Sequence, residues 1–235
     1  MFRNIIDNKE LIIALTRKEI NKRYKQSALG WLWSIIKPLL IVLTFTFLFG
    51  NLSKLDSLNT PYPLMVFSGL LPWELFANVI TRSTSSILSY KKLVVSTGVP
   101  SIIFPIVCAI SCLFEFLIIF ILMIFMFIGF NWPLRISIFL YPILTLCILF
   151  SGLSFGLWFA KIAVWYRDIK FTISNLLQMM LLLTPVGYNV ISLPKSLSFI
   201  SSINPLTPLI NTSRYLLLGI NPPSIQSIFY SLIFF

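Results

Sequence analysis

Residues 102–130 read IIFPIVCAISCLFEFLIIFILMIFMFIGF, with Glu115 as the one charged side chain in the stretch. About 20 apolar residues are enough for a helix to cross the hydrocarbon core of a bilayer. This run is longer than that, so its helix can cross at a tilt. The stretch decides the fold class, because it predicts an all-α membrane protein. Since a charge at that depth is costly, we expect Glu115 to be protonated or hydrogen-bonded against protein.

The composition of the whole chain agrees with a membrane protein. Of its 235 residues, 57% are apolar and 11% are charged, too few charges to cover a soluble surface. The chain has no histidine, the commonest general base and metal ligand. Cys108, Cys112 and Glu115 share a helix face, but two thiols and one carboxylate are a poor zinc set. We therefore expect neither an enzyme nor a metal site.

Further apolar segments lie on both sides of this run. The predicted spans, which make up one domain over residues 1–235, are residues 31–50, 62–81, 102–130, 136–160, 171–190 and 224–235. The last run is too short to cross, so we expect a truncated sixth helix. No cleavable signal peptide is expected, since about thirty mostly polar residues precede the first apolar run.

The basic residues predict the orientation of the chain. Residues 1–37, 82–101 and 161–170 carry 14 of the 18 Lys and Arg residues. By the positive-inside rule these segments and the N-terminus lie in the cytoplasm. The net charge of +11 is then explained by topology and anionic lipid, and nucleic acid is not an expected partner.

Residues 1–30 carry the pattern of an amphipathic helix. Apolar side chains recur at helical spacing at Ile13, Ile20, Tyr24, Ala28 and Trp31. Basic side chains occupy other positions, at Arg17, Lys18, Lys22, Arg23 and Lys25. This segregation predicts a helix lying on the membrane surface, and a solvated cytosolic arm is the alternative.

Residues 185–223 are rich in proline but stay apolar in stretches such as 206–210. Non-helical backbone at membrane depth persists only where protein or water covers it. We expect short re-entrant or interfacial helices before the last span. An ordinary external loop is the alternative, because Pro and Asn clusters also mark loops.

An ordered set of short motifs extends over nearly the whole chain. It comprises Arg17-Lys18-Glu19-Ile20, Arg23-Tyr24-Lys25-Gln26-Ser27, Leu29-Gly30-Trp31-Leu32-Trp33, Lys37-Pro38-Leu39-Leu40, Phe45-Thr46-Phe47, Phe49-Gly50, Phe67-Ser68-Gly69-Leu70-Leu71-Pro72-Trp73, Tyr166-Arg167-Asp168-Ile169 and Asn204-Pro205-Leu206-Thr207. The set closely resembles the permease subunits of type-2 ABC exporters of O-antigen, capsule-like and teichoic-acid polysaccharides. Residues 91–100 follow the family pattern only loosely.

The resemblance implies a multi-pass protein of the bacterial cytoplasmic membrane with six transmembrane helices per subunit. It also implies a homodimer, a separate ABC ATP-binding subunit, and a glycan cargo on an undecaprenyl pyrophosphate lipid. A Gly-Lys pair occurs nowhere in the chain, so a P-loop is absent. We therefore expect ATP and Mg²⁺ to bind the partner subunit and no cofactor to bind this chain.

Two groups of residues are candidates for the cargo path. The basic members could receive the cargo's pyrophosphate, or serve only topology and lipid contact. The aromatic members could stack on sugar rings, or form the interfacial belt that anchors spans. The candidates are Arg17, Arg23, Tyr24, Lys25, Trp31, Trp33, Trp73 and Phe76.

A third group are candidates for coupling to the ATP-binding subunit. In the resembling family the surface helix and the first inner loop make this contact. The first inner loop corresponds here to residues 82–100, the connector between the second and third predicted spans. Apolar residues flanked by charge suit insertion into a groove on a soluble partner, although the loop could merely join two spans. The candidates are Lys91, Lys92, Leu93, Val94, Arg167 and Asp168.

Two rival functions stay open at this point. The chain could belong to a type-2 exporter that moves a drug or a simple lipid. A membrane-embedded glycosyl- or acyltransferase is the other rival, and it should show paired carboxylates or a histidine at a membrane face.

Overall fold

The computed structural model describes residues 8–25, 30–49, 60–188, 204–220, 222–224, 226–227 and 230. Over these residues the regular structure is helical, as predicted, and no strand is present. The helices are α2 (Lys9–Lys25), η1 (Gly30–Leu32), α3 (Trp33–Phe49), α4 (Tyr62–Ser89), α5 (Lys91–Thr97), α6 (Ile103–Gly129), η3 (Ile136–Leu140), α7 (Tyr141–Trp165), α8 (Ile169–Leu183) and α10 (Leu206–Leu218).

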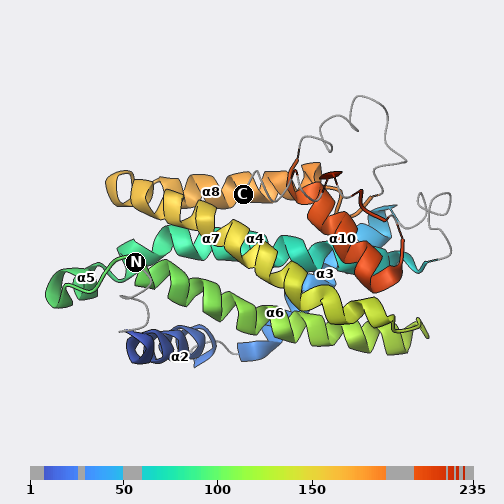
Figure 1. The fold of residues 1–235 in the computed structure, drawn as a ribbon, viewed down its shortest axis with the longest axis horizontal. Helices are drawn as coiled ribbons and strands as arrows, with labels where there is room; N and C mark the ends of the chain where they lie inside the picture. Colours follow the sequence, from blue (N-terminus) through green and yellow to red (C-terminus); the bar gives the residue numbers. More distant parts are fainter. Residues whose placement is uncertain are drawn as a thin grey trace.

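Helix α4 lies at the centre of the bundle and contacts α3, α6, α7, α8 and α10. The long helices run along the long axis of the molecule, as Figure 1 shows. Helices α2 and α5 lie at one end, where α2 packs against α6. Helix α10 caps the opposite end (Figure 1). The bundle therefore has two chemically distinct ends joined by α4.

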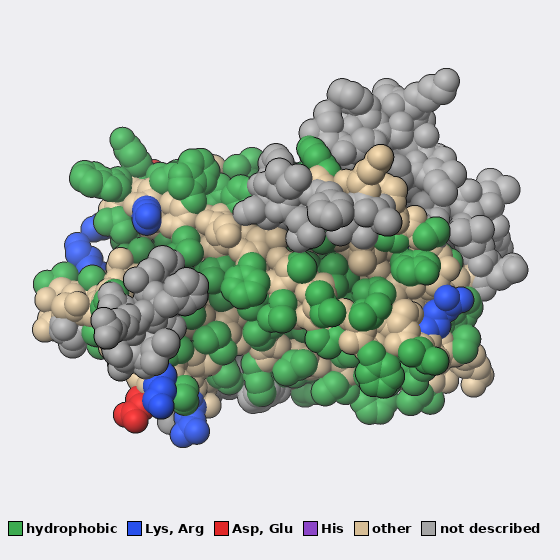
Figure 2. Space-filling model, in the orientation of Figure 1, with side chains coloured by type: hydrophobic (Ala, Val, Ile, Leu, Met, Phe, Trp, Pro, Cys, Tyr) green, Lys and Arg blue, Asp and Glu red, His purple; other side chains and the backbone are tan. Residues whose placement is uncertain are grey.

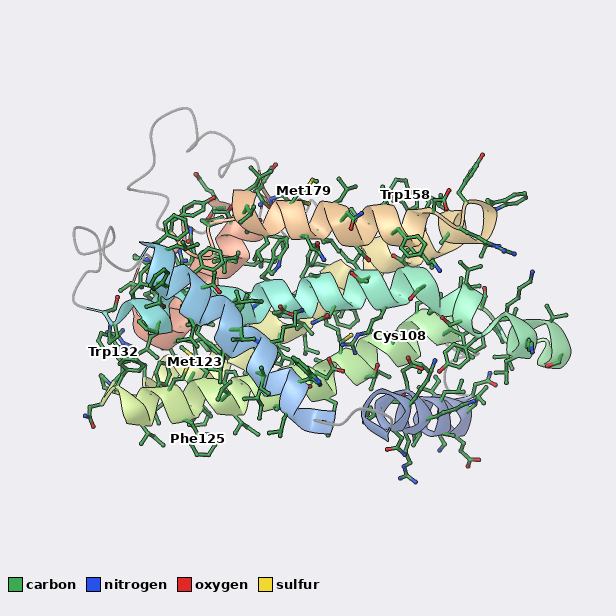
Figure 3. All side chains as sticks on the ribbon, turned by 180° about the vertical axis from the view of Figure 1, so that it is seen from behind. Cys108, Met123, Phe125, Trp132, Trp158 and Met179 are labelled. Atoms are coloured by element: carbon green, nitrogen blue, oxygen red, sulfur yellow. The ribbon has the colours of Figure 1, made fainter. Side chains whose placement is uncertain are left out.

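Within the described residues, three helical segments are long and apolar enough to cross a membrane: Tyr62–Ser89, Ile103–Gly129 and Ile136–Trp165. Helices α3 and α8 are also apolar but shorter. Hydrophobic side chains cover much of the face in Figure 2, and basic side chains gather mainly at the α2 and α5 end. In Figure 3, Met123 lies on the inner side of α6 and Phe125 on its outer side. An apolar surface this extensive is expected where lipid is the solvent.

Helix α4 continues to Ser89, past the predicted end of its span at residue 81. Its polar last turns stay helical because their hydroxyls donate to carbonyls of the preceding turn. The bonds run from Thr84 to Ile80 (2.7 Å), from Ser86 to Ser83 (2.7 Å) and from Ser89 to Ser85 (2.9 Å). Such hydroxyls satisfy themselves within the helix and need no water. The serine-rich sequence, interpreted as a connector, is therefore a helix.

The ends of the other helices lie closer to the predicted ends of the spans. Helix α6 matches the predicted residues 102–130 closely, and α7 continues to Trp165, past the predicted end at residue 160. Helix α8 ends at Leu183, because Pro185 lies just beyond it. Most of the predicted last span, residues 224–235, lies outside the described residues.

Helix α10 forms within the segment expected to hold short helices. Asn204 lies two residues before its first residue, and the Asn204 side-chain oxygen accepts from the Leu206 amide at 3.0 Å. Pro72 interrupts the hydrogen bonding of α4, because a proline has no amide hydrogen to give the carbonyl of Ser68. The Ser213 hydroxyl of α10 donates to that carbonyl at 2.6 Å. Helix α10 thus supplies to α4 the hydrogen-bond donor that Pro72 lacks.

The turn after α8 is held to α10 by a fully buried arginine. The guanidinium of Arg214 donates to the carbonyls of Pro185 at 2.7 Å, Val186 at 2.8 Å and Tyr188 at 3.2 Å. A Cβ added to Gly69 would lie 3.0 Å from the Val186 oxygen, so the turn approaches α4 closely there. Residues 185–188, Arg214 and Gly69 are called the outer latch below.

Candidate functional site

A polar stripe runs along one face of the otherwise apolar helix α4. Glu74, Asn78 and Arg82 follow one another at intervals of four residues, which places them on the same side of the helix. Residues from α3 and α6 pair with them. Together with Lys37 of α3 and Glu115 of α6, these three residues form what we call the polar cleft.

One half of the polar cleft lies between α3 and α4. The Lys37 ammonium is 3.2 Å from one oxygen of Glu74, and Asn78 donates to the other oxygen at 2.9 Å. These groups, with Glu115, line a cavity of about 510 Å³. Trp33 of α3 lines the same cavity and is half exposed. A charged, hydrogen-bonding and aromatic lining therefore surrounds an open volume inside an apolar bundle.

The other half lies nearer the α2 end. Arg82 forms an ion pair with Glu115, and both side chains are largely buried. A second cavity, of about 300 Å³, is lined by this pair and by Ser111, Glu19, Ile20 and Lys22. Glu115 lines both cavities. Its expected hydrogen-bonded state is confirmed, with Arg82 as the partner.

The charges of the polar cleft balance. Two cations face two anions, so the cleft is not built to hold a free anion or cation tightly. Isolated charges at this depth are costly, and each is compensated here by an ionic neighbour. What remains is a set of donors and acceptors beside an aromatic ring. This lining suits a neutral, hydroxyl-rich group, such as a sugar.

The α2 end holds a second functional candidate, the corner between α4 and α5. The Tyr90 hydroxyl donates to Glu19 of α2 at 2.5 Å, and its ring stacks on Phe104 of α6 with centroids 5.0 Å apart. Burial raises the pKa of the Tyr90 phenol, and the bond to Glu19 raises it further. The phenol thus stays a donor at neutral pH. It ties together α2, α6 and the start of α5.

The predicted coupling residues take different positions around this corner. Lys91 and Lys92 are exposed on α5, and Arg167 and Asp168 are exposed in the turn between α7 and α8. Leu93 and Val94 are partly buried against the cluster of α2 and α6 that contains Ile12, Leu15 and Phe104. Val95 is 76% exposed. The outermost apolar side chain of α5 is therefore Val95.

The predicted cargo-path residues are also dispersed. Trp33 lines the polar cleft, and Arg17 is exposed on α2. Trp73 and Phe76 are both 4% exposed in the main core. Phe76 also lines an apolar cavity of about 280 Å³ between α4, α7 and α8. The side chains of Arg23, Tyr24, Lys25 and Trp31 lie outside the described residues.

Four residues of the polar cleft were not among the candidate site residues predicted from the sequence: Lys37, Glu74, Asn78 and Arg82. A signal for three of them was present, since Glu74, Asn78 and Arg82 are polar residues at helical spacing within an apolar segment. Their partners on other helices could not be deduced, because the packing of α3 and α6 on α4 determines them.

The bundle of apolar helices, its internal polar cleft and its basic end define a membrane-embedded permease. The family profile of ABC-2 type transporters matches residues 10–218. The chain belongs to this family. Members of the family are membrane subunits of transporters that work with ATP-binding subunits.

Two named relatives align with about nine tenths of the chain and a third with about one third. The O-antigen export system permease protein RfbA of Klebsiella pneumoniae is 26% identical over 211 residues, 89% of this chain and 81% of the relative. The protein of the same name from Myxococcus xanthus is 28% identical over 215 residues, with 90% and 82% covered. The polysialic acid transport protein KpsM of Escherichia coli is 29% identical over 79 residues, 34% and 31% of the two chains.

Proposed function

We propose that this chain is the membrane subunit of an ABC exporter that moves a lipid-linked polysaccharide across the bacterial cytoplasmic membrane. The observation that carries the proposal is the alignment with O-antigen export permeases, which extends over about nine tenths of the chain. The cargo proposed is a glycan on undecaprenyl pyrophosphate. The polar cleft supports a sugar-containing cargo, because its charges balance and its lining offers hydrogen-bond donors and acceptors beside Trp33.

The proposed topology has six spans per subunit, with the N-terminus in the cytoplasm. The three long helices and the apolar helices α3 and α8 support five of them. The end with α2 and α5 is the cytoplasmic end, because it holds most of the described basic side chains. Two such subunits would form the complete pathway, as a homodimer.

Cysteine labelling tests this orientation at two exposed positions. A cysteine in place of Lys91 should resist a membrane-impermeant reagent applied from outside, and one in place of Arg135 should react. Reaction at position 91 with protection at position 135 would reverse the proposed orientation.

The ATP-binding subunit would dock on α2, on α5 and on the turn between α7 and α8. ATP and Mg²⁺ would bind that subunit. The ATP-binding subunit can drive a conformational change of this chain only if the contacts between the two subunits differ between two states. Val95 is the best single probe, since it protrudes and Leu93 and Val94 also pack against α6. Val95→Asp should abolish transport-stimulated ATP hydrolysis without unfolding the permease.

The function itself is tested with the permease purified together with its ATP-binding subunit. Lipids that copurify are extracted and identified by mass spectrometry, and the complex is reconstituted into liposomes. We expect a polyprenyl-pyrophosphate glycan that stimulates ATP hydrolysis and is transported. Stimulation by a drug or by a simple phospholipid alone would contradict the proposed cargo and favour the rival exporter.

A further inference from the structure

A groove between α2 and α6 is left open by the packing of these two helices. Ile12 and Leu15 of α2 are buried against the start of α6, but Ile13 is 61% exposed. The groove has a volume of about 440 Å³. Its lining comprises Ile12, Ile13, Thr16, Arg17, Ile20 and Asn21 of α2, with Ile110 and Phe114 of α6.

The lining of this groove is amphipathic. Apolar side chains from both helices form its floor, including Ile13, Ile110 and Phe114. Arg17 supplies a cation, and Asn21, one turn further along α2, supplies an amide. A groove with an apolar floor and a basic edge fits a molecule that has a hydrocarbon chain and an anionic head.

The α2 side of the groove also holds a buried hydroxyl. The side-chain oxygen of Thr16 is inaccessible to solvent, and it makes no hydrogen bond with the residues that the structure describes. Buried hydroxyls are usually paired, since an unpaired one costs free energy. Thr16 lines the groove, so a change of its side-chain rotamer would turn the hydroxyl toward an oxygen-rich head bound there.

The α6 side of the groove continues into a stripe that faces outward. Ile110 and Phe114 are followed at helical spacing by Leu117, Ile121 and Phe125, all of them exposed. Figure 3 shows Phe125 on the outer side of the bundle. A hydrocarbon chain that starts at the groove therefore has a continuous apolar track along α6 toward the middle of the membrane.

We infer that this groove binds one anionic glycerophospholipid. Its phosphate would contact Arg17, its glycerol and ester oxygens would lie near Thr16 and Asn21, and one acyl chain would follow the α6 stripe. The lipid would fasten α2 to α6 beside the corner where Glu19 holds Tyr90. The inference does not depend on the identity of the transported cargo.

Native mass spectrometry of the intact permease in detergent tests the site. The probes are dioleoylphosphatidylglycerol and dioleoylphosphatidylcholine, which differ in head charge but not in chains. We expect one phosphatidylglycerol per chain that is retained more strongly than phosphatidylcholine. Arg17→Gln should weaken its binding about fivefold, the equivalent of about 1 kcal/mol for one basic residue at an anionic surface.

Matched variants separate a defined site from general attraction. Lys18→Gln removes the same charge from an exposed neighbour that does not line the groove, and it should leave binding unchanged. Ile110→Trp fills the groove and should weaken binding although every charge is kept. Circular dichroism and thermal unfolding confirm that each variant is folded, which is expected because Arg17, Lys18 and Ile110 are exposed.

Four results would overturn the inference. Equal losses in Arg17→Gln and Lys18→Gln would show diffuse attraction to the whole helix. Equal retention of the two lipids, or unchanged binding in Ile110→Trp, would show that the groove does not select this ligand. A polyprenyl pyrophosphate that displaces phosphatidylglycerol, and whose binding alone depends on Arg17, would assign the groove to cargo.

Discussion

Two arginines inside the bundle are compensated in opposite ways. Arg82 pairs with a carboxylate on another helix, Glu115, and lines a cavity. Arg214 is fully buried in the outer latch, and its described hydrogen bonds go to three backbone carbonyls. An ionic partner on a separate helix can be exchanged when helices move. The carbonyls of a tight turn cannot be exchanged in this way. The polar cleft around Arg82 is therefore suited to movement, and the outer latch around Arg214 is suited to support.

The largest effect is expected at the outer latch. Arg214→Met removes the donors of three carbonyls, two of them buried and one partly buried, and each buried unpaired group costs about 1–3 kcal/mol. We expect a loss of folding free energy on the order of 5 kcal/mol, measured as a fall in the thermal unfolding temperature and in yield. Arg214→Lys should lose less folding free energy than Arg214→Met but should not reach the stability of the unchanged protein. The reason is that an ammonium cannot donate in all the directions that a guanidinium does.

The ion pair of the polar cleft should behave differently. Arg82→Met or Glu115→Leu alone removes one partner of this buried ion pair and should cost about 3–5 kcal/mol in stability. The double variant Arg82→Met with Glu115→Leu should recover most of it, since two apolar groups replace a buried pair at little cost. A double variant that is as unstable as either single one would contradict a simple pair.

Export by that double variant sharpens the comparison further. If the pair only stabilises the bundle, the folded double variant should export normally. We expect instead that it folds and assembles but exports poorly, because the cleft has lost polar groups that the proposed cargo would contact. Export is measured as glycan that appears at the cell surface, with membrane levels of the permease as the control.

A smaller effect is expected at the corner that joins α2 to α4. Tyr90→Phe keeps the ring on Phe104 but removes the hydrogen bond to Glu19, a loss of about 1.5–3 kcal/mol for a bond to a charged group. Residues 9–25 should then exchange their amide hydrogens faster. Tyr166→Phe, at an exposed tyrosine of the same end, is the control and should change nothing. Unchanged exchange in Tyr90→Phe would show that the hydroxyl does not fasten α2.

The smallest effect is expected at Lys37. Its side chain is 60% exposed, so its pair with Glu74 is well screened. Lys37→Met should change stability by less than about 1 kcal/mol. A change as large as that of Arg82→Met would mean that the two halves of the polar cleft act as one network.

Much of the helical plan could be predicted from the sequence, because apolar length alone decides which segments suit a bilayer. The run at residues 102–130 shows this best, since α6 covers Ile103–Gly129. The end of α4 could not be predicted in the same way. Polar residues such as Ser85 and Ser89 look like a connector, yet their hydroxyls bond within the helix.

The candidate site was harder to predict than the fold. Glu115 was noticeable as a lone charge in an apolar run, but its partner Arg82 lies 33 positions away. That pairing depends on how α4 and α6 pack. Trp73, beside a proline within a span, gave no sign that it would be buried in the core. The spacing of residues in the sequence predicts which side chains share a helix face. The packing of the helices determines which residues that face contacts.

The serine of α10 that completes the hydrogen bonding at Pro72 has a mechanical consequence. With 28 residues at about 1.5 Å each, α4 is a rod roughly 42 Å long that reaches from the outer latch to the Tyr90 corner. A rod of that length turns a tilt of about 5° into a shift of roughly 4 Å at its far end, provided that it does not bend. The proline is its weak point, and Ser213 stiffens it there. Helix α4 can therefore transmit a small tilt from one end of the bundle to the other, and the hydrogen bond from Ser213 supports it at the proline.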